Sequence, residues 1–136
     1  MGLAERRAAK DFETNRYPAV KKDVDAAAKF DVPVEVKWDS LAVAEYAHMY
    51  EEAWLKVYFR PLIDALKAIT VDAMGADALK ASLKRIVIQN MKDNSSSNYW
   101  AIFTDGILTL DHAPVSNVDY IDDRKTQLQK ILEEKL

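Results

Sequence analysis

Two histidines and two glutamates have the side-chain types and spacing that best suit chemistry in this sequence. Glu45 and His48 stand three residues apart, which on a helix places both side chains on one face, and Glu52 follows one turn later. Di-iron helical bundles use such a pair twice, on separate helices, with additional glutamate ligands. Here the pair comes once, and a catalytic zinc commonly takes three protein ligands, so a site would require His112 to converge with His48.

This group of residues has two interpretations, and the sequence leaves both open. In the first, Glu45, His48, Glu52 and His112 form a site for a small ligand or a metal. In the second, Glu45, His48 and Glu52 belong to an ordinary solvated helix face, with side-chain pairs worth about 0.2 to 0.5 kcal/mol each. The second interpretation needs no convergence of distant segments, so we predict no bound metal.

Other reactive side chains occur without the surroundings that catalysis needs. Asp111 and His112 would suit a base with its orienting carboxylate, but neighbouring residues of a strand point to opposite faces. The serines at 95–97 lie in a polar run without a Gly-x-Ser-x-Gly context. The glycines at positions 2, 75 and 106 cannot build a phosphate-binding loop. We therefore predict no catalytic residues and no cofactor.

The composition limits the class of protein and its partners. A chain of 136 residues, with 49% hydrophobic and 30% charged residues, fits a single compact domain over residues 1–136. Cysteine is absent, which excludes disulfide scaffolds and thiol nucleophiles. The net charge of -3 argues against a nucleic-acid surface, and no run approaches the ~20 apolar residues of a membrane span. We expect a soluble cytoplasmic protein that binds neither nucleic acid nor membranes.

The best-defined element is a β-hairpin around Asp105-Gly106. This dipeptide suits a two-residue type I′ turn, in which both residues have positive φ. The turn fixes the register, with Thr104 opposite Ile107, and strand alternation then divides the side chains between two faces. One face is predicted to point into the core and carries Tyr99, Ala101, Phe103, Leu108, Leu110 and His112. The second face carries Trp100, Ile102, Thr104, Ile107, Thr109 and Asp111.

This second hairpin face is too apolar to be left in water without cause. Trp100, Ile102 and Ile107 would form an apolar patch, and such patches usually mark a covered or functional surface. Either a helix of the same chain covers the patch or another molecule does. If another molecule does, these three residues are the predicted interface.

Helical patterns surround the hairpin in the sequence. Residues 1–16 are Ala-rich and charged, and we expect a loosely packed helical arm because they have little apolar surface to bury. A long helix over residues 41–60 follows the cap Asp39-Ser40, and Pro61 predicts a kink or restart at Arg60-Pro61. Aromatic residues along this helix favour a core position, with a ligand pocket as the alternative: Tyr46, Tyr50, Trp54 and Tyr58. The other predicted elements are strands at 32–38 and 85–90 and helices at 17–30, 62–71, 76–83 and 117–134.

These elements predict an α+β fold, in which about five or six helices pack with a small, mainly antiparallel sheet of about four strands. Because no catalytic motif is present, we expect the protein to act by binding, as a homodimer, through the second hairpin face or the N-terminal arm. The alternative is a small-ligand or metal-binding protein, or an enzyme. Its site would lie near Glu45, His48 and His112 or at the Arg60-Pro61 kink.

Overall fold

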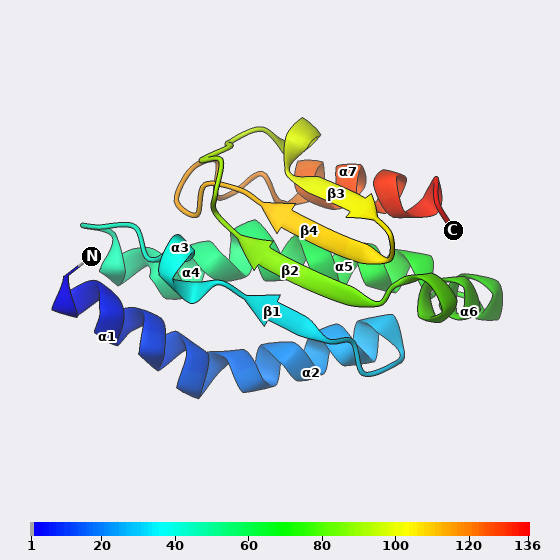
Figure 1. Cartoon of the computed structure of the whole chain (residues 1–136), viewed down its shortest axis with the longest axis horizontal. Coiled ribbons are helices and arrows are strands. Elements are labelled where there is room, and N and C mark those ends of the chain that lie inside the picture. Colours follow the sequence, from blue (N-terminus) through cyan, green and yellow to red (C-terminus); the bar gives the residue numbers. More distant parts are fainter. Residues whose placement is uncertain (1) are drawn as a thin grey trace.

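The computed structural model describes residues 2–136 as an α+β fold with one four-stranded sheet (Figure 1). The strands are β1 (Val34–Val36), β2 (Arg85–Gln89), β3 (Ala101–Thr104) and β4 (Ile107–Asp111), and their order across the sheet is β1-β2-β4-β3. The first two pairs, β1 with β2 and β2 with β4, are parallel, whereas β3 and β4 are antiparallel. The predicted α+β class is confirmed. The predicted mainly antiparallel character is wrong, because the sheet is mixed and mostly parallel.

The connections between the strands explain the parallel pairs. Between β1 and β2 the chain passes through the helical layer, and a crossover of this kind returns the next strand in the same direction. After β2, residues 90–100 lead the chain to the far edge of the sheet, where β3 runs back, and β4 then fills the place between β3 and β2. Local sequence patterns identify strands, but they do not state which strands are neighbours.

The hairpin has the register that its turn predicts. Thr104 pairs with Ile107, and the ladder continues to the pair of Ala101 and Leu110. Asp105 has a φ of 56° and Gly106 a φ of 80°, as a type I′ turn requires. A Cβ on Gly106 would also lie 2.6 Å from the Cγ of Lys84, so glycine is needed here for space as well as for conformation.

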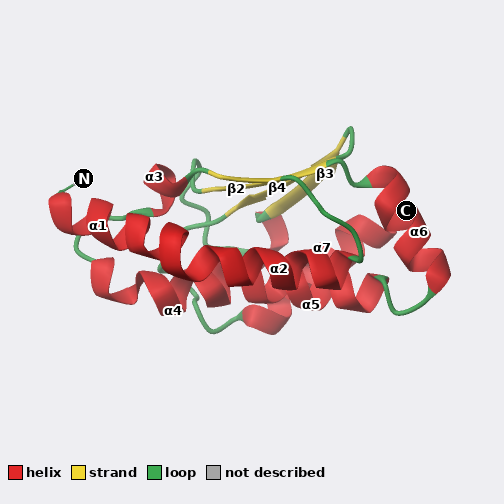
Figure 2. Cartoon of the chain, turned by 90° about the horizontal axis from the view of Figure 1, so that it is seen from below, coloured by secondary structure: helices red, strands yellow, loops and turns green. Residues whose placement is uncertain are grey.

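The long helices lie together on one face of the sheet, and Figure 2 shows no described element on the opposite face. The helices are α1 (Leu3–Asp11), α2 (Tyr17–Ala28), α3 (Trp38–Leu41), α4 (Tyr50–Trp54), α5 (Arg60–Ile69), α6 (Ala73–Ser82) and α7 (Ile121–Glu133). The inner strands β2 and β4 bury their helix-facing side chains fully, namely Ile86, Ile88, Leu108 and Leu110, whereas Val34 and Val36 of β1 are half-buried. Among residues 2–136, no helix has the combination of length and apolar character that crossing a bilayer demands.

Two π-helical turns, Phe12–Arg16 and Leu55–Phe59, join α1 to α2 and α4 to α5. The Tyr17 N–H donates to the Phe12 carbonyl, and the Arg60 N–H donates to the Leu55 carbonyl, so each bond spans one residue more than in an α-helix. In both cases a proline comes next, Pro18 or Pro61, and the helix continues through it. The predicted kink or restart at Arg60-Pro61 is therefore realised as a π-helical turn, after which α5 begins at Arg60.

The predicted helix over residues 41–60 is wrong in its first part. Leu41 ends α3, and the chain reaches α4 through non-helical residues 42–46 and a 3₁₀ turn at Ala47–Met49. Glu45 has a φ of 74°, outside helical geometry. The side chain of Tyr50 holds this segment, because its hydroxyl donates to the Val43 carbonyl at 2.6 Å. The segment therefore departs from the helical spacing of the sequence and is held by this contact within itself.

The N-terminal segment, for which the composition predicts a loosely packed arm, contacts the core through Phe12. Phe12 is only 2% exposed. It stacks on Phe59, with ring centroids 6.0 Å apart, and meets Trp54 edge-on at 5.1 Å. Met1 lies outside the described residues. One aromatic side chain, inserted where the two π-helical turns meet, therefore fixes the first helix to the core.

Candidate functional site

The uncovered side of the sheet, called the open face below, lacks a second layer formed by residues 2–136. Its side chains are those that point away from the helices in the observed register: Glu35, Arg85, Val87, Gln89, Ile102, Thr104, Ile107, Thr109 and Asp111. Ile102 on the edge strand is 49% exposed, and Ile107 is half-buried beside it. Two of the three predicted interface residues, Ile102 and Ile107, therefore lie on this face.

Trp100, the third predicted interface residue, does not lie on the open face. Its side chain is 0% exposed, and its Nε1 donates to the Arg124 carbonyl of α7 at 3.2 Å. The strand alternation starts only at Ala101, because Trp100 follows a 3₁₀ turn at Ser97–Tyr99 and has helical dihedrals of −84° and −16°. The same turn leaves Tyr99, predicted to face the core, 74% exposed.

The charged groups of the open face lie at its β1 and β2 side and at one end. Glu35 and Arg85 are 3.8 Å apart and about half exposed, so their attraction contributes little. At the end of the face, the Asp111 carboxylate accepts hydrogen bonds from the Gln89 amide and from the backbone N–H groups of Met91 and Lys92. Asp111 is thus fully occupied in holding the loop after β2. Apart from Asp111 at its end, the half of the face formed by β3 and β4 carries only apolar and hydroxyl side chains.

His112 is part of the core. It is 0% exposed, and its Nδ1 lies 2.6 Å from the Ala113 carbonyl oxygen, to which it donates. Burial lowers the pKa of His112 below its ordinary value of 6.5. The Tyr58 hydroxyl donates to the His112 carbonyl, and burial raises the pKa of Tyr58, which keeps this donor protonated. The orientation of His112 is therefore set by structural contacts.

The other predicted ligand residues are not brought together with His112. Glu45 precedes the helix, so it does not share a helical face with His48. Glu52 pairs with Lys56 at 2.8 Å. Within residues 2–136, no group of three or more His, Asp or Glu side chains is arranged to hold a metal ion. A ligand or metal role for these residues stays a prediction.

His48 lies instead at a small hollow beside the first π-helical turn. The hollow has a volume of about 130 Å³ and is lined by Ala8, Asp11, Phe12, Arg16, Ala47, His48, Tyr50 and Glu51. Arg16 and Glu51 close it with an ion pair of 2.6 Å. Ligand pockets usually measure about 300–1,000 Å³, so this hollow has room only for an ion or a few atoms. The helical spacing of the sequence did not indicate that Arg16 and Glu51 would meet.

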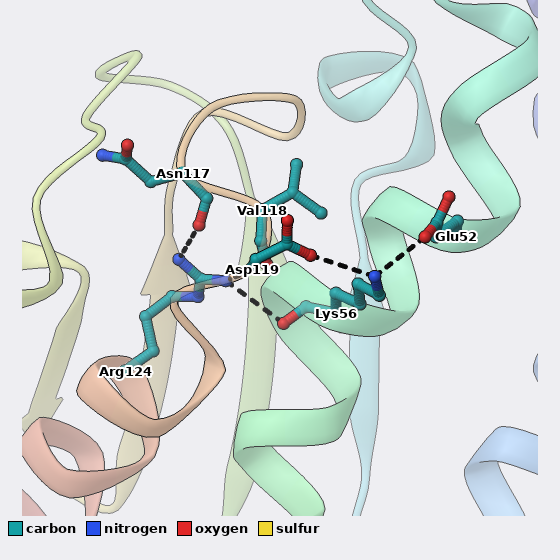
Figure 3. Close-up of polar contacts among 6 residues, drawn as sticks. All are labelled: Glu52, Lys56, Asn117, Val118, Asp119 and Arg124. Atoms are coloured by element: carbon teal, nitrogen blue, oxygen red, sulfur yellow. Dashed lines mark hydrogen bonds and ion pairs between the residues drawn. The ribbon is translucent and has the colours of Figure 1, made fainter.

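The second π-helical turn depends on a buried arginine that sequence analysis missed. The Arg60 N–H is taken by Leu55 and Pro61 has no N–H, so the Lys56 carbonyl loses both possible helical donors. Figure 3 shows Arg124 of α7 reaching this carbonyl at 3.3 Å and the Asn117 carbonyl at 2.7 Å. It also donates to the Val118 carbonyl at 2.8 Å. The only sequence signal was the position of Pro61 after an otherwise regular helix.

Surface charges complete this junction. The Lys56 ammonium lies between Glu52, at 2.8 Å, and Asp119, at 3.0 Å (Figure 3). Nearby, Arg60 lines a shallow hollow of about 310 Å³ with Asp64 and with residues 119–123. The ion pair of Lys56 and Asp119 connects the loop before α7 to the long helix. The observed contacts near Arg60-Pro61 therefore join α7 and the loop before it to the long helix.

Comparisons of this chain with protein-family models, with curated proteins and with solved structures gave no significant match.

Proposed function

We propose that this protein acts by self-association, as a homodimer that pairs the open faces of two sheets. The observation that carries the proposal is that none of the described residues 2–136 forms a layer over a face that exposes Ile102 and half-exposes Ile107. A two-layer domain with an apolar sheet side normally covers that side, by its own helices or by a partner.

The chemistry of the face favours a second copy of the chain as the covering partner. Its β3 and β4 half consists of Ile102, Thr104, Ile107 and Thr109, with Asp111 at its end. The Asp111 carboxylate accepts hydrogen bonds from its own chain, so it does not require an opposite charge across the interface. In a twofold dimer the same patch meets itself, which an apolar and hydroxyl surface tolerates. Two sheets stacked in this way would lie about 10 Å apart with their side chains interdigitated.

The size of the face limits the strength of the dimer. Four strands spaced about 4.8 Å apart, with up to five residues each at about 3.3 Å per residue, make a face of roughly 300 Å². Standard protein interfaces bury about 800 Å² on each partner. We therefore expect a weak dimer that forms in the micromolar range and dissociates on dilution.

Sedimentation velocity over a wide range of concentration tests the proposal. The natural chain should shift from monomer towards dimer as concentration rises, whereas Ile102→Glu should remain monomeric, because it places a charge inside the interface. Met74→Glu is the matched control, since Met74 is 83% exposed but lies on α6, away from the open face. A natural chain that stays monomeric at near-millimolar concentration would exclude the dimer. Equal association of Ile102→Glu and the natural chain would exclude this face.

A further inference from the structure

The two edges of the sheet differ in how they expose their backbone. At the β3 edge, the Lys135 ammonium donates to the Phe103 carbonyl at 2.7 Å, so a lysine covers one of the few outward-pointing groups. At the β1 edge, the Ile86 N–H donates to Pro33 and the Lys37 N–H donates to Ile88, both at 2.9 Å. These bonds show that the backbone hydrogen-bonding groups of alternate residues, at positions 33, 35 and 37, point towards β2.

It follows that the residues in between, Val34 and Val36, direct their N–H and C=O groups away from the sheet. Neither makes an outward backbone or side-chain hydrogen bond within the described part of the chain. Figure 1 shows β1 as the outermost strand on the side of α1 and α2. Among the described residues, β1 therefore presents outward backbone groups with which another strand could pair. At the β3 edge, Lys135 covers one of the corresponding groups.

We propose that β1 is a strand-addition site for an extended polypeptide segment that carries lysine or arginine opposite Glu35. The site is the backbone edge of β1. Glu35 also belongs to the open face, but none of the β3 and β4 side chains of the proposed dimer takes part, and the inference does not depend on dimerisation. Strand addition supplies affinity through backbone hydrogen bonds and specificity through alternate side chains.

The preference for a basic residue comes from the position of Glu35. It lies between the two outward-bonding valines, so in an antiparallel addition it faces the incoming strand at a position without hydrogen bonds, where opposite side chains come closest. Its partner Arg85 is 3.8 Å away in an exposed pair, too weak to occupy the carboxylate fully. An incoming ammonium or guanidinium group would thus find an accessible carboxylate.

A hollow along the same strand has matching chemistry. It has a volume of about 430 Å³ and is lined by Glu13, Glu35, Val36, Lys37, Trp38, Asp39, Ser40 and Met91. Three of these side chains are carboxylates and one is a lysine, and the half-buried Trp38 supplies an aromatic face. A segment continuing past Val36 would bring its next basic side chain here, where carboxylates and an indole both favour a cation.

The same geometry disfavours a second copy of β1 as the added strand. Twofold antiparallel pairing centred on Glu35 would set Val34 opposite Val36 and Glu35 opposite its own copy. Like charges directly opposite each other destabilise a strand pair. Charge complementarity therefore indicates a basic partner and not this chain itself.

Nuclear magnetic resonance of the full-length protein with capped peptides of alternating valine and lysine tests the inference. Binding should slow hydrogen exchange of the Val34 and Val36 amides, with no such effect at the β3 amides of Ala101 and Phe103. A peptide with glutamate in place of lysine should bind roughly tenfold more weakly, and in the Glu35→Lys variant this preference should reverse. Running the titration in the Ile102→Glu background separates the result from dimerisation.

The outcome is decisive in either direction. Peptides methylated on the nitrogens that face β1 should lose binding, whereas methylation of the other nitrogens should leave it intact, and this control needs no change in the protein. Protection confined to other amides, no detectable binding of the valine-lysine peptide, or an unchanged preference in Glu35→Lys would each overturn the proposal.

Discussion

At the scale of single residues, the polar groups inside this protein serve to join elements. His112, Tyr58 and Arg124 each bond backbone carbonyls of another segment or of their own loop. Buried donors and acceptors cost about 1–3 kcal/mol each when left without partners, so these contacts constrain the fold. Their consequences are measurable as stability.

His112 should make stability depend on pH. Because burial lowers its pKa below 6.5, the unfolded chain binds a proton in a pH range where the folded chain does not. The free energy of unfolding should therefore fall as pH drops below about 6.5, until the folded imidazole also titrates. Urea unfolding at several pH values should show a shallower dependence in His112→Gln than in the natural chain. Equal slopes in the two proteins would contradict the prediction.

Arg124 should be the most sensitive polar residue. Replacement by methionine, of similar length, leaves the carbonyls of Lys56, Asn117 and Val118 without their donor. We expect a loss of about 3 kcal/mol in the free energy of unfolding, measured by chemical denaturation. The control is Lys130→Met, which removes a positive charge from an exposed position of the same helix. A loss below about 0.5 kcal/mol for Arg124→Met, similar to a surface change, would count against the role given to Arg124.

At the scale of elements, the helical segments α1–α2 and α4–α5 share one feature. Each contains a π-helical turn shortly before a proline. The turn ends two residues before the proline, so the extra residue is accommodated next to the position where the ladder lacks an N–H donor. In the second helix the carbonyl left behind is taken by Arg124. The two turns also bring Phe12 and Phe59 into contact. The prolines thus mark the junction between the helices and do not interrupt them.

Gly75 should be irreplaceable at the start of α6. A Cβ at this position would lie 1.8 Å from the Ile69 carbonyl oxygen, and the Gly75 N–H is also bound by the capping Asp72 at 2.8 Å. Gly75→Ala should lower the free energy of unfolding by more than about 2 kcal/mol, although alanine favours helix. The reverse change in the same helix, Ala76→Gly, should cost only about 1 kcal/mol. Thermal unfolding that places Gly75→Ala at or above the natural chain would disprove the close approach.

At the scale of the whole molecule, one hydrophobic cluster connects the N-terminal helix, the helical layer and the sheet. Phe12, Trp38, Trp54 and Phe59 form its aromatic end, with ring centroids between 5.1 and 6.0 Å apart in their contacts. A segment with little apolar surface of its own is therefore held by a single well-placed ring. We therefore expect the N-terminal helix to unfold together with the rest of the protein.

Phe12→Ala tests this connection. We expect a loss of about 3 kcal/mol or more, with unfolding still a single cooperative transition in urea. Leu3→Ala in the same helix is the control, because Leu3 is 53% exposed and should matter little. A separate early transition of the helical signal, with the rest unchanged, would show that the segment is an independent arm.

The sequence alone determined the features that depend on neighbouring residues. The Asp105-Gly106 hairpin, its register as far as Ala101 and the α+β class follow from turn geometry and side-chain alternation. Only the tertiary structure decided which strands are neighbours and that Trp100 turns inward to Arg124. It also decided that residues 42–46 leave the helix and that His48 and His112 belong to different parts of the molecule. The reason is that these features depend on contacts between segments far apart in the chain, and local spacing carries no information about such contacts.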